Sequence, residues 1–316
     1  MDALIATNYF FHKQKNFYRG KVRDVYNIND DILVMIASDR ISAFDVVMPK
    51  PIPYKGQVLN QTASFFFDLT KDVVPNWRIS SPHSNVTIGH KCKPYLVEIV
   101  IRGYLTGHAW REYKSGKRTI CGVPMPDGMR ENDKFEKPII TPTIKASSGH
   151  DTDISKEDII KQGLVNEQDY EVIENYTHKL YQFGVDYAKT QGLILVDTKY
   201  EFGNKDGVIM FMDEIHTPDS SRYFYADTYD AIQAKDQQQR QLSKEFVRQW
   251  LISQGFQGQE GTSAPLFPND LIDSITDRYV ELYQNITGLT FIKGTYDNLE
   301  NNMEKIIISE LAKLVE

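Results

Sequence analysis

Short hydrophobic runs that favour strands dominate the first third of the chain. They occupy Ile32–Ala37, Val46–Met48 and Leu96–Arg102, and Gly, Pro, Asn and Asp separate them. Leu59–Leu69 interrupts this pattern with apolar residues at mixed spacing and is predicted to be a helix. Residues 17–110 are therefore predicted to form a strand-rich region that contains one helix.

Helical periodicity dominates the second half of the chain. Ser155 followed by Asp158 is typical of a capping box, so a short helix should begin at Lys156. A long helix should follow and end before Gly192, a residue typical of the position just past a helix C-terminus. Its apolar residues recur at spacings of three and four: Tyr170, Ile173, Tyr176, Leu180, Phe183 and Tyr187. Core packing explains this stripe and three further amphipathic helices predicted over Leu242–Ser253, Pro268–Gln284 and Asn298–Leu314.

Residues 114–150 are rich in Gly, Pro and charged residues. This stretch is long for a passive connection, so we interpret it as a long loop that acts as a lid, a binding loop or a crossing between domains. The domain boundary is placed at its start. The sequence thus predicts a β-rich domain over residues 1–113 and a domain of helices and strands over residues 114–316.

Composition narrows the class of protein. The 316 residues are 41% hydrophobic and 25% charged, as in an ordinary globular protein. No apolar run reaches the roughly 18 residues of a membrane span, and no signal-peptide pattern is visible, so we expect a cytoplasmic protein without a membrane partner. A net charge of -7 argues against a nucleic-acid partner. Two cysteines, Cys92 and Cys121, are too few for a disulfide scaffold, and no histidine pair has zinc-site spacing.

Residues 193–214 carry the most informative chemistry. Two apolar runs flank the turn sequence Asn204–Gly207, so a β-hairpin is predicted. Because side chains alternate along a strand, Asp197, Lys199 and Glu201 should share one face. An apolar strand that becomes charged on one face is expected to run from a core into a polar cleft.

The returning strand ends in Asp213 and Glu214, which could bring further carboxylates to this cleft. Several carboxylates without cysteine suit a hard cation such as Mg²⁺, which shares oxygen ligands with phosphates. A solvated hairpin with a cross-strand salt bridge fits the same residues equally well. The next loop contains Asp219 and Arg222 and is either a cradle for a phosphate or carboxylate or a plain turn.

Two other segments contain candidate anion-binding residues. Near the N-terminus, Gly20 could let backbone amides approach a phosphate, with Lys21 and Arg23 supplying charge. This segment has neither a P-loop nor a Rossmann fingerprint, and a charged surface hairpin is the alternative. Arg102 follows an apolar strand beside two glycines, and is either an anion contact or an arginine that lies over the sheet edge.

Together these segments resemble one family, the phosphoribosylaminoimidazole-succinocarboxamide (SAICAR) synthetases of purine biosynthesis, in its longer form. The family's motifs occur in order: Arg-Gly-Lys-Val-Arg-Asp-Val-Tyr at 19–26, Ser-Asp-Arg-Ile-Ser-Ala-Phe-Asp at 38–45, Val-Glu-Ile-Val-Ile-Arg-Gly-Tyr-Leu-Thr-Gly at 97–107, Leu-Val-Asp-Thr-Lys-Tyr-Glu-Phe-Gly at 195–203, and Asp-Glu-Ile-His-Thr-Pro-Asp-Ser-Ser-Arg at 213–222. Each motif alone is modest evidence, whereas their shared order is strong evidence.

The resemblance implies an α+β fold. A β-rich antiparallel N-terminal lobe similar to a kinase small lobe would bind nucleotide, and a larger α+β domain with C-terminal helices would carry the Mg²⁺ and substrate sites, with an ATP cleft between them. The implied activity is an ATP-dependent ligase that joins L-aspartate to the carboxylate of carboxylated aminoimidazole ribonucleotide and yields SAICAR, ADP and phosphate. Because a carboxylate is a poor electrophile, an acyl phosphate is the expected intermediate. The long form favours a monomer, with a homodimer as the alternative.

The family pattern also implies residue roles. Glu201 and Asp213 would hold Mg²⁺ and ATP, and Gly20, Lys21, Arg23 and Lys145 would contact ATP. Asp197 and Lys199 would be the catalytic residues that line the imidazole nucleotide. Its carboxylate, ribose or phosphate would contact Arg102, His108, Asp219 and Arg222. Many members carry Ser at the position of His108, so this chain departs from the pattern there.

Two other functions share parts of this pattern. A small-metabolite kinase would use a related ATP lobe and the same carboxylates but would need no aspartate. An inactive nucleotide-binding regulatory module would be expected to lack some of Lys21, Glu201, Asp213 and Arg222, and all four are present. Dependence of ADP release on aspartate distinguishes the synthetase from both.

Overall fold

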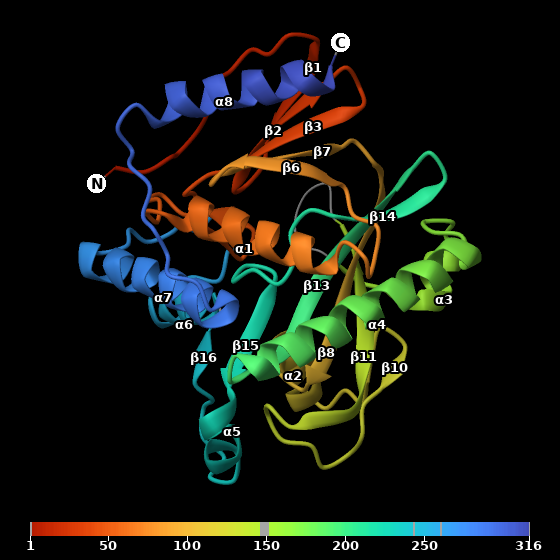
Figure 1. Cartoon of the computed structure of the whole chain (residues 1–316). Coiled ribbons are helices and arrows are strands. Elements are labelled where there is room, and N and C mark those ends of the chain that lie inside the picture. The colour runs from red at the N-terminus through yellow and green to blue at the C-terminus, as the bar shows by residue number, and fades with distance from the viewer. Residues whose placement is uncertain (1, 146–151, 243, 260, 316) are drawn as a thin grey trace. The chain divides into compact units, whose positions relative to one another are not determined.

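The computed structural model describes residues 2–145, 152–242, 244–259 and 261–315. These residues form eight helices and sixteen strands (Figure 1). Backbone contacts divide the chain into two compact units, which we call the first unit (residues 1–69, 77–92 and 244–316) and the second unit (residues 70–76 and 93–243). No described helix is both long enough and apolar enough to cross a bilayer.

The first unit contains a five-stranded antiparallel sheet with strand order β1-β2-β3-β7-β6. Its strands are β1 (Gln14–Arg19), β2 (Arg23–Ile28), β3 (Ile32–Ala37), β6 (Arg78–His83) and β7 (Val86–His90). Helix α8 (Leu299–Leu314) buries Met303 and Ile307 against sheet residues that include Val34 (Figure 1). The apolar stripe predicted over 298–314 is therefore confirmed as core packing.

A second core of the first unit lies among helices and a short hairpin. Its elements are α1 (Lys55–Thr70), α6 (Glu245–Ser253), α7 (Asn269–Thr287), β4 (Ser42–Ala43) and β5 (Val46–Val47). Val58, Val247 and Ile275, one from each helix, are fully buried there. The helices predicted over 59–69, 242–253 and 268–284 are confirmed, although Leu242 belongs to a strand instead of α6.

The second unit contains a seven-stranded sheet with strand order β12-β11-β8-β13-β15-β16, in which β14 also pairs with β13. Its strands are β8 (Lys93–Tyr104), β11 (Lys134–Ile144), β12 (Thr152–Asp153), β13 (Leu193–Lys205), β14 (Val208–Met212), β15 (Ser221–Tyr225) and β16 (Gln241–Leu242). The predicted hairpin is confirmed as β13 and β14. Asp206 and Gly207 form its turn with φ of 52° and 86°, the left-handed backbone that suits a tight hairpin.

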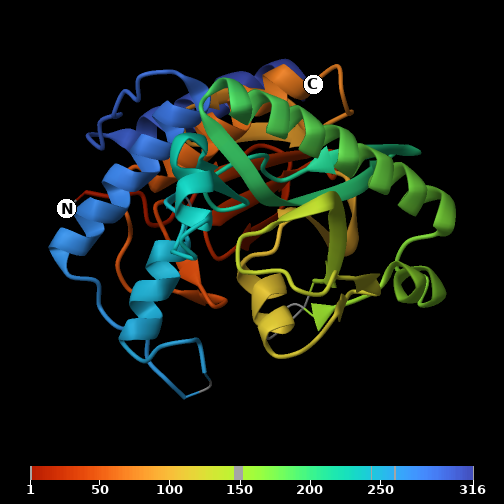
Figure 2. The ribbon, with the colours of Figure 1, turned by 90° about the horizontal axis from the view of Figure 1, so that it is seen from below.

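Helices and small strands complete the second unit. They are α2 (Gly107–Lys114), β9 (Thr119–Ile120), β10 (Val123–Pro124), α3 (Lys156–Lys161), α4 (Glu167–Thr190) and α5 (Ala226–Gln233). The Ser155 side chain accepts a hydrogen bond from the Asp158 backbone N–H, so the predicted cap of α3 is confirmed. Helix α4 crosses the sheet (Figure 2), and Gly192 beyond its end has φ of 70°, as expected for a residue past a C-terminus.

The prediction that residues 114–150 form a long loop is wrong for its second part. Lys134–Ile144 is a strand of the sheet and pairs with β8. Pro138 and Pro142 disguised it in the sequence because proline cannot donate a ladder hydrogen bond. Strand β11 tolerates Pro142 because the two-residue strand β12 pairs only with the end of β11, at Thr143 and Ile144. It tolerates Pro138 because the pairing register of β11 with β8 shifts between Lys134 and Ile139. Residues 146–150 of the predicted loop lie outside the described residues.

The two units differ from the predicted domains in the assignment of residues 70–76, 93–113 and 244–316. Residues 93–104 belong to the second unit because β8 pairs with both β11 and β13. The C-terminal helices belong to the first unit because they supply much of its two cores. The chain therefore leaves the first unit twice, after residue 69 and after residue 92, and returns to it at residues 77 and 244.

Candidate active site

One face of the second unit's sheet carries most of the candidate residues. Across β8 and β13, Arg102 pairs with Asp197, and Glu98 pairs with Glu201. Lys199 lies between these two pairs on the same strand face. The prediction that Asp197, Lys199 and Glu201 share a face is therefore confirmed, and α4 covers the opposite face.

At one end of this face lies a carboxylate–lysine cluster, which consists of Glu98, Lys145, Lys199 and Glu201. The Lys199 Nζ lies 2.9 Å from Glu98 Oε1 and 3.2 Å from Glu201 Oε1. Lys145 forms an ion pair with Glu201, and its Nζ lies 4.0 Å from Glu98 Oε1. Sequence reasoning gave the Glu98 side chain no role, because only the strand register reveals that it lies opposite Glu201.

The two lysines decide the charge state of this cluster. Burial alone would raise the pKa of Glu201, but Lys199 and Lys145 outweigh it and lower that pKa to about 2. Burial, only partly offset by Lys199, raises the pKa of Glu98. Burial also opposes the charge on Lys199, yet Glu201 and Glu98 raise its pKa well above the ordinary value. The cluster thus holds opposite charges in close balance.

Asp213 lies just after β14 and contributes to the field at this end of the sheet. It is half-buried, has φ of 63°, and helps to raise the pKa of Lys199. Within the described ranges, no three Asp, Glu, His or Cys side chains form a group that could hold a metal ion by itself. The salt bridge between Lys199 on β13 and Glu98 on β8 agrees with the interpretation of these residues as a cross-strand ion pair. The carboxylates of Glu201 and Asp213 are also possible Mg²⁺ ligands, as the other interpretation requires.

At the other end of the face lies an arginine cluster, which consists of Arg102, Asp197 and Arg222. Asp197 Oδ2 lies 3.4 Å from Arg102 Nη1 and 3.7 Å from Arg222 Nη1, so a single carboxylate oxygen serves two guanidinium groups. The three side chains are only 8–11% exposed. Burial lowers the pKa of Arg102, against the effect of Asp197. Two buried cations thus share one counter-ion.

Two threonines that the sequence did not single out hold these arginines. Arg102 Nε donates to Thr141 Oγ1 at 2.9 Å, and Arg222 Nη1 donates to Thr106 Oγ1 at 2.9 Å. Gly107, at φ of +57°, lies so close to Arg222 that a Cβ there would come within 2.7 Å of its terminal nitrogens. The guanidinium of Arg222 therefore packs directly on the start of α2.

The remaining candidates of the second unit lie around this cluster. His108, in the first turn of α2, places Nε2 2.8 Å from Asp153 Oδ2 in a partly exposed pair. Asp219 is half-buried in the turn before β15, where its backbone N–H donates to Thr217 Oγ1. Thr217 also donates to Glu214 at 2.7 Å. Glu214 therefore stabilises this turn, a structural role that the sequence prediction of a cleft carboxylate did not include.

Gly20, Lys21 and Arg23 belong to the first unit, where residues 20–22 connect β1 and β2. Arg40 fixes this loop by donating to the carbonyl oxygens of Gly20 and Lys21 at 3.0 and 3.1 Å. Lys21 Nζ lies 2.5 Å from Asp45 Oδ1 in an exposed ion pair. The motif at 38–45 thus holds the loop predicted to contact ATP.

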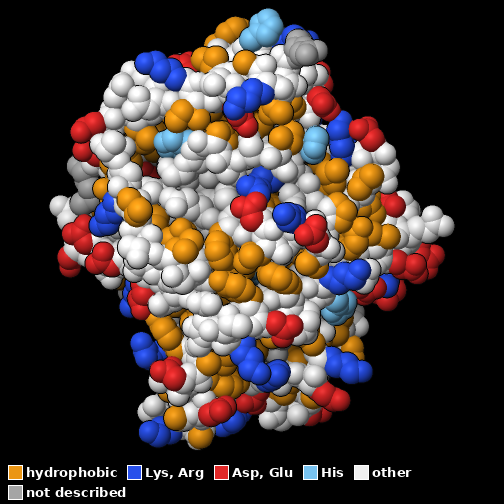
Figure 3. All heavy atoms as spheres, viewed as in Figure 1, with side chains coloured by type: hydrophobic (Ala, Val, Ile, Leu, Met, Phe, Trp, Pro, Cys, Tyr) orange, Lys and Arg blue, Asp and Glu red, His pale blue; other side chains and the backbone are white. Residues whose placement is uncertain are grey.

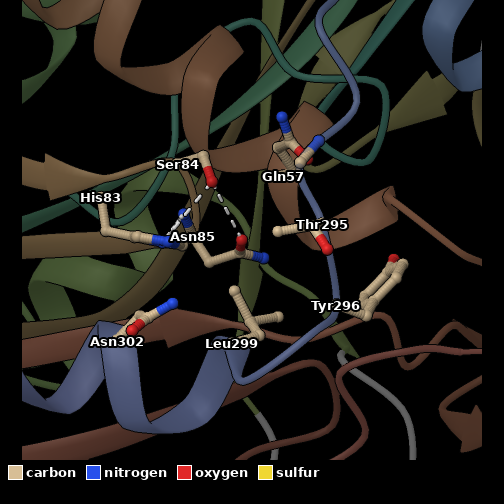
Figure 4. Close-up of a pocket in the computed structure, with 9 residues that line it drawn as sticks. Gln57, His83, Ser84, Asn85, Thr295, Tyr296, Leu299 and Asn302 are labelled. Carbon is tan, nitrogen blue, oxygen red and sulfur yellow. Dashed lines mark hydrogen bonds between the residues drawn. The ribbon is translucent and has the colours of Figure 1, made fainter.

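Neither the molecular surface drawn in Figure 3 nor a pocket in the first unit suggests a different site. On the face drawn in Figure 3, acidic and basic side chains are interspersed without a large patch of one sign. A pocket of about 120 Å³ in the first unit lies among α1, the β6–β7 turn and residues 294–302 (Figure 4). None of the residues predicted from the sequence lines it. Gln57 in its wall instead hydrogen-bonds Ile292 and Gly294, which fixes the loop before α8.

Comparisons of the sequence and of the structure with known proteins all match the same family of enzymes. The SAICAR synthetase family model matches residues 16–265. A "phosphoribosylaminoimidazole-succinocarboxamide synthase" from Flavobacterium psychrophilum is 58% identical over 98% of this chain and 99% of its own length. The structure titled "SAICAR-synthase from Saccharomyces cerevisiae complexed SAICAR" has a TM-score of 0.75 and 33% identity over 87% of this chain and 96% of that one. Another, "SAICAR synthetase (Type-2) in complex with ADP", has a TM-score of 0.67 and 26% identity over 88% and 100%.

Proposed function

Because the chain belongs to the SAICAR synthetase family, we propose that it joins L-aspartate to the carboxylate of carboxylated aminoimidazole ribonucleotide at the expense of ATP. The products are SAICAR, ADP and phosphate, in the biosynthesis of purines. The relatives named as this synthase align with nearly the whole chain, which does not favour a metabolite kinase or an inactive regulatory module.

The arginine cluster carries this proposal. Buried charges are expensive unless they are paired, and here Arg102 and Arg222 lie 3.4 and 3.7 Å from the same carboxylate oxygen of Asp197. An oxyanion of the substrate would bring negative charge to the two guanidinium groups and would receive several charge-assisted hydrogen bonds from them. A nucleotide that has both a phosphate and a carboxylate meets that requirement. We assign this end of the face, with Asp219 and His108 at its edge, to the imidazole nucleotide.

The carboxylate–lysine cluster suits MgATP. Mg²⁺ usually takes one or two protein carboxylates and completes its shell with waters and substrate phosphates. Glu201 and Asp213 are the carboxylates we assign to it, and bound Mg²⁺ would neutralise phosphate charge. Lys145 and Lys199 would then exchange their carboxylate partners for phosphate oxygens. The loop that contains Gly20, Lys21 and Arg23 is assigned to the ATP phosphates.

The two assignments suggest a route for the reaction. A carboxylate oxygen of the nucleotide attacks the γ-phosphorus, the bond to ADP breaks, and an acyl phosphate forms. The amine of L-aspartate then attacks the carbonyl carbon, phosphate leaves with the bonding pair, and the amide nitrogen loses its proton. Lys199 is the member of the carboxylate–lysine cluster that lies two residues from Asp197 on β13, where its charge stabilises the transferring phosphoryl group. Asp197 orients both arginines against the nucleotide.

An omission assay tests the proposal. The purified protein is mixed with MgATP, the carboxylated nucleotide and L-aspartate, and each component is left out in turn while ADP and SAICAR are measured. We expect ADP only in the complete mixture, with one SAICAR formed per ADP. Sustained ADP formation without aspartate, together with a stable phosphorylated product, would support a kinase instead. ATP binding without turnover in any mixture would support a regulatory module.

A further inference from the structure

We propose that Thr106 is a positioning residue whose hydroxyl orients Arg222 toward the substrate instead of capping helix α2. This inference rests on the proposed function, because it assigns Arg222 to the imidazole nucleotide.

Thr106 occupies the cap position of α2 without using its side chain as a cap. Its backbone has φ of -144° and ψ of 170°, as a cap residue should, yet its hydroxyl accepts no hydrogen bond from the helix. Ser155 and Asn166, at the corresponding positions of α3 and α4, both accept from the backbone N–H three residues later. Helix α2 therefore lacks the side-chain capping hydrogen bond that the next two helices, α3 and α4, both have.

The hydroxyl of Thr106 accepts from Arg222 Nη1 instead, at 2.9 Å, and the threonine is only 5% exposed. A cation at a helix N-terminus is electrostatically unfavourable, so the guanidinium needs a specific contact to stay there. Gly107 leaves the space for it. Fixing a flexible arginine before the ligand arrives lowers the entropy that binding must overcome. The same arrangement recurs at Arg102, which donates to the buried Thr141.

The test compares Thr106, whose hydroxyl contacts Arg222, with Ser155, whose hydroxyl caps a helix. Thr106→Val keeps the shape of the side chain and removes the hydroxyl. We expect it to raise the KM for the imidazole nucleotide about tenfold, because hydrogen bonds to charged groups contribute at that level, and to leave the KM for ATP nearly unchanged. Thr106→Ser, which restores the hydroxyl, should return the KM to within about threefold of the wild type.

Ser155→Ala is the matched control. It removes a hydroxyl that does cap a helix of the same unit, so it should lower the Tm by about 2–4 °C and leave both KM values unchanged. A merely structural role for Thr106 would make Thr106→Val behave like Ser155→Ala. That result, or an unchanged KM for the nucleotide, would overturn the inference.

Direct binding separates this inference from the proposed function. Calorimetric titration of the carboxylated nucleotide, without ATP or aspartate, should show the same weakening in Thr106→Val. If the wild type binds the nucleotide and Thr106→Val binds it equally well, only the role of Thr106 is wrong. If the wild type makes no SAICAR and binds no nucleotide, inorganic phosphate becomes the probe. Equal phosphate affinity in the wild type and Thr106→Val would then overturn the role of Thr106 as well.

Discussion

The two charged clusters both draw residues from strands β8 and β13, but they balance charge in opposite ways. The carboxylate–lysine cluster pairs two carboxylates with two lysines, whose side chains are 43% and 30% exposed. The arginine cluster sets two guanidiniums against one carboxylate, and its side chains are almost completely buried. One cluster is balanced and accessible, whereas the other is unbalanced and enclosed.

This difference indicates two kinds of binding. Lysine is a flexible point charge, so a partly exposed lysine can exchange a carboxylate for an incoming phosphate at little cost. A buried arginine fork has a fixed geometry and favours one oxyanion in one orientation. The balanced end therefore suits a cosubstrate that arrives with its own metal ion. The unbalanced end suits a nucleotide that must be held in a single position.

The strongest test breaks the balanced cluster by Glu201→Gln. The variant retains the shape of the side chain but removes the charge assigned to Mg²⁺, so kcat should fall about 10³-fold. Asp213→Asn should act in the same direction and leave the fold intact. Glu174→Gln, which breaks a surface ion pair between Glu174 on α4 and Lys156 on α3, is the control and should be silent. Near-normal turnover of Glu201→Gln or Asp213→Asn at saturating Mg²⁺ would contradict the assigned role.

The next test breaks the unbalanced cluster by Arg222→Ala. The variant removes one of the two buried guanidiniums, so the KM for the imidazole nucleotide should rise about 100-fold. The KM for ATP should change less than about threefold, because ATP is assigned to the other cluster. Arg222→Lys should lie between the alanine variant and the wild type, since it keeps the charge and loses the fork. Equal increases in both KM values would place Arg222 outside the nucleotide site.

Local patterns predicted the secondary structure where local interactions determine it. The capping serine of α3, the glycine after α4 and the Asp206–Gly207 turn all act within a few residues, and the structure confirms each of them. Strand β11 escaped prediction because its prolines carry a loop signal, whereas its partner β8 is some 40 residues earlier in the chain. The return of residues 244–316 to the first unit depends on core packing, which no local pattern reveals.

In the candidate site, too, local patterns predicted what lies on one strand, and contacts between distant segments were missed. Period-two alternation correctly placed Asp197, Lys199 and Glu201 on one face. Glu98 and Thr141 were missed as partners because each contacts the site from a neighbouring strand, and register is not visible in one sequence. The hydroxyl of Thr106 was missed for a different reason. Helix α2 was not predicted from the sequence, and only the structure shows that Thr106 precedes a helix and that its hydroxyl contacts Arg222.

A third test uses pH to measure the charge balance. The folded pKa of Glu201 is about 2, below the ordinary 4.5, so this residue stabilises the fold above about pH 4.5 and loses that effect as pH falls towards 2. Glu98, whose pKa is raised, has the opposite sign and offsets part of the effect. The net loss between pH 5 and 3 should be on the order of 1–2 kcal/mol. Tm measured against pH should therefore fall more steeply for the wild type than for Glu201→Gln, and parallel curves would contradict this account.

The smallest effect is expected from His108→Ala at the edge of the arginine cluster. His108 and Asp153 are 39% and 33% exposed, and pairs this accessible contribute at most about 1 kcal/mol. Burial would raise the pKa of Asp153, but the hydrogen bond from His108 lowers it on balance. The variant removes that hydrogen bond and leaves the contacts of Arg102 with Asp197 and of Arg222 with Thr106 in place. The KM for the imidazole nucleotide should change less than about threefold, as it should in His108→Ser, which carries the residue that many family members have there. If His108→Ala raised the KM for the imidazole nucleotide as much as Arg222→Ala, the arginine cluster would extend to the first turn of α2. His108 would then bind the nucleotide directly.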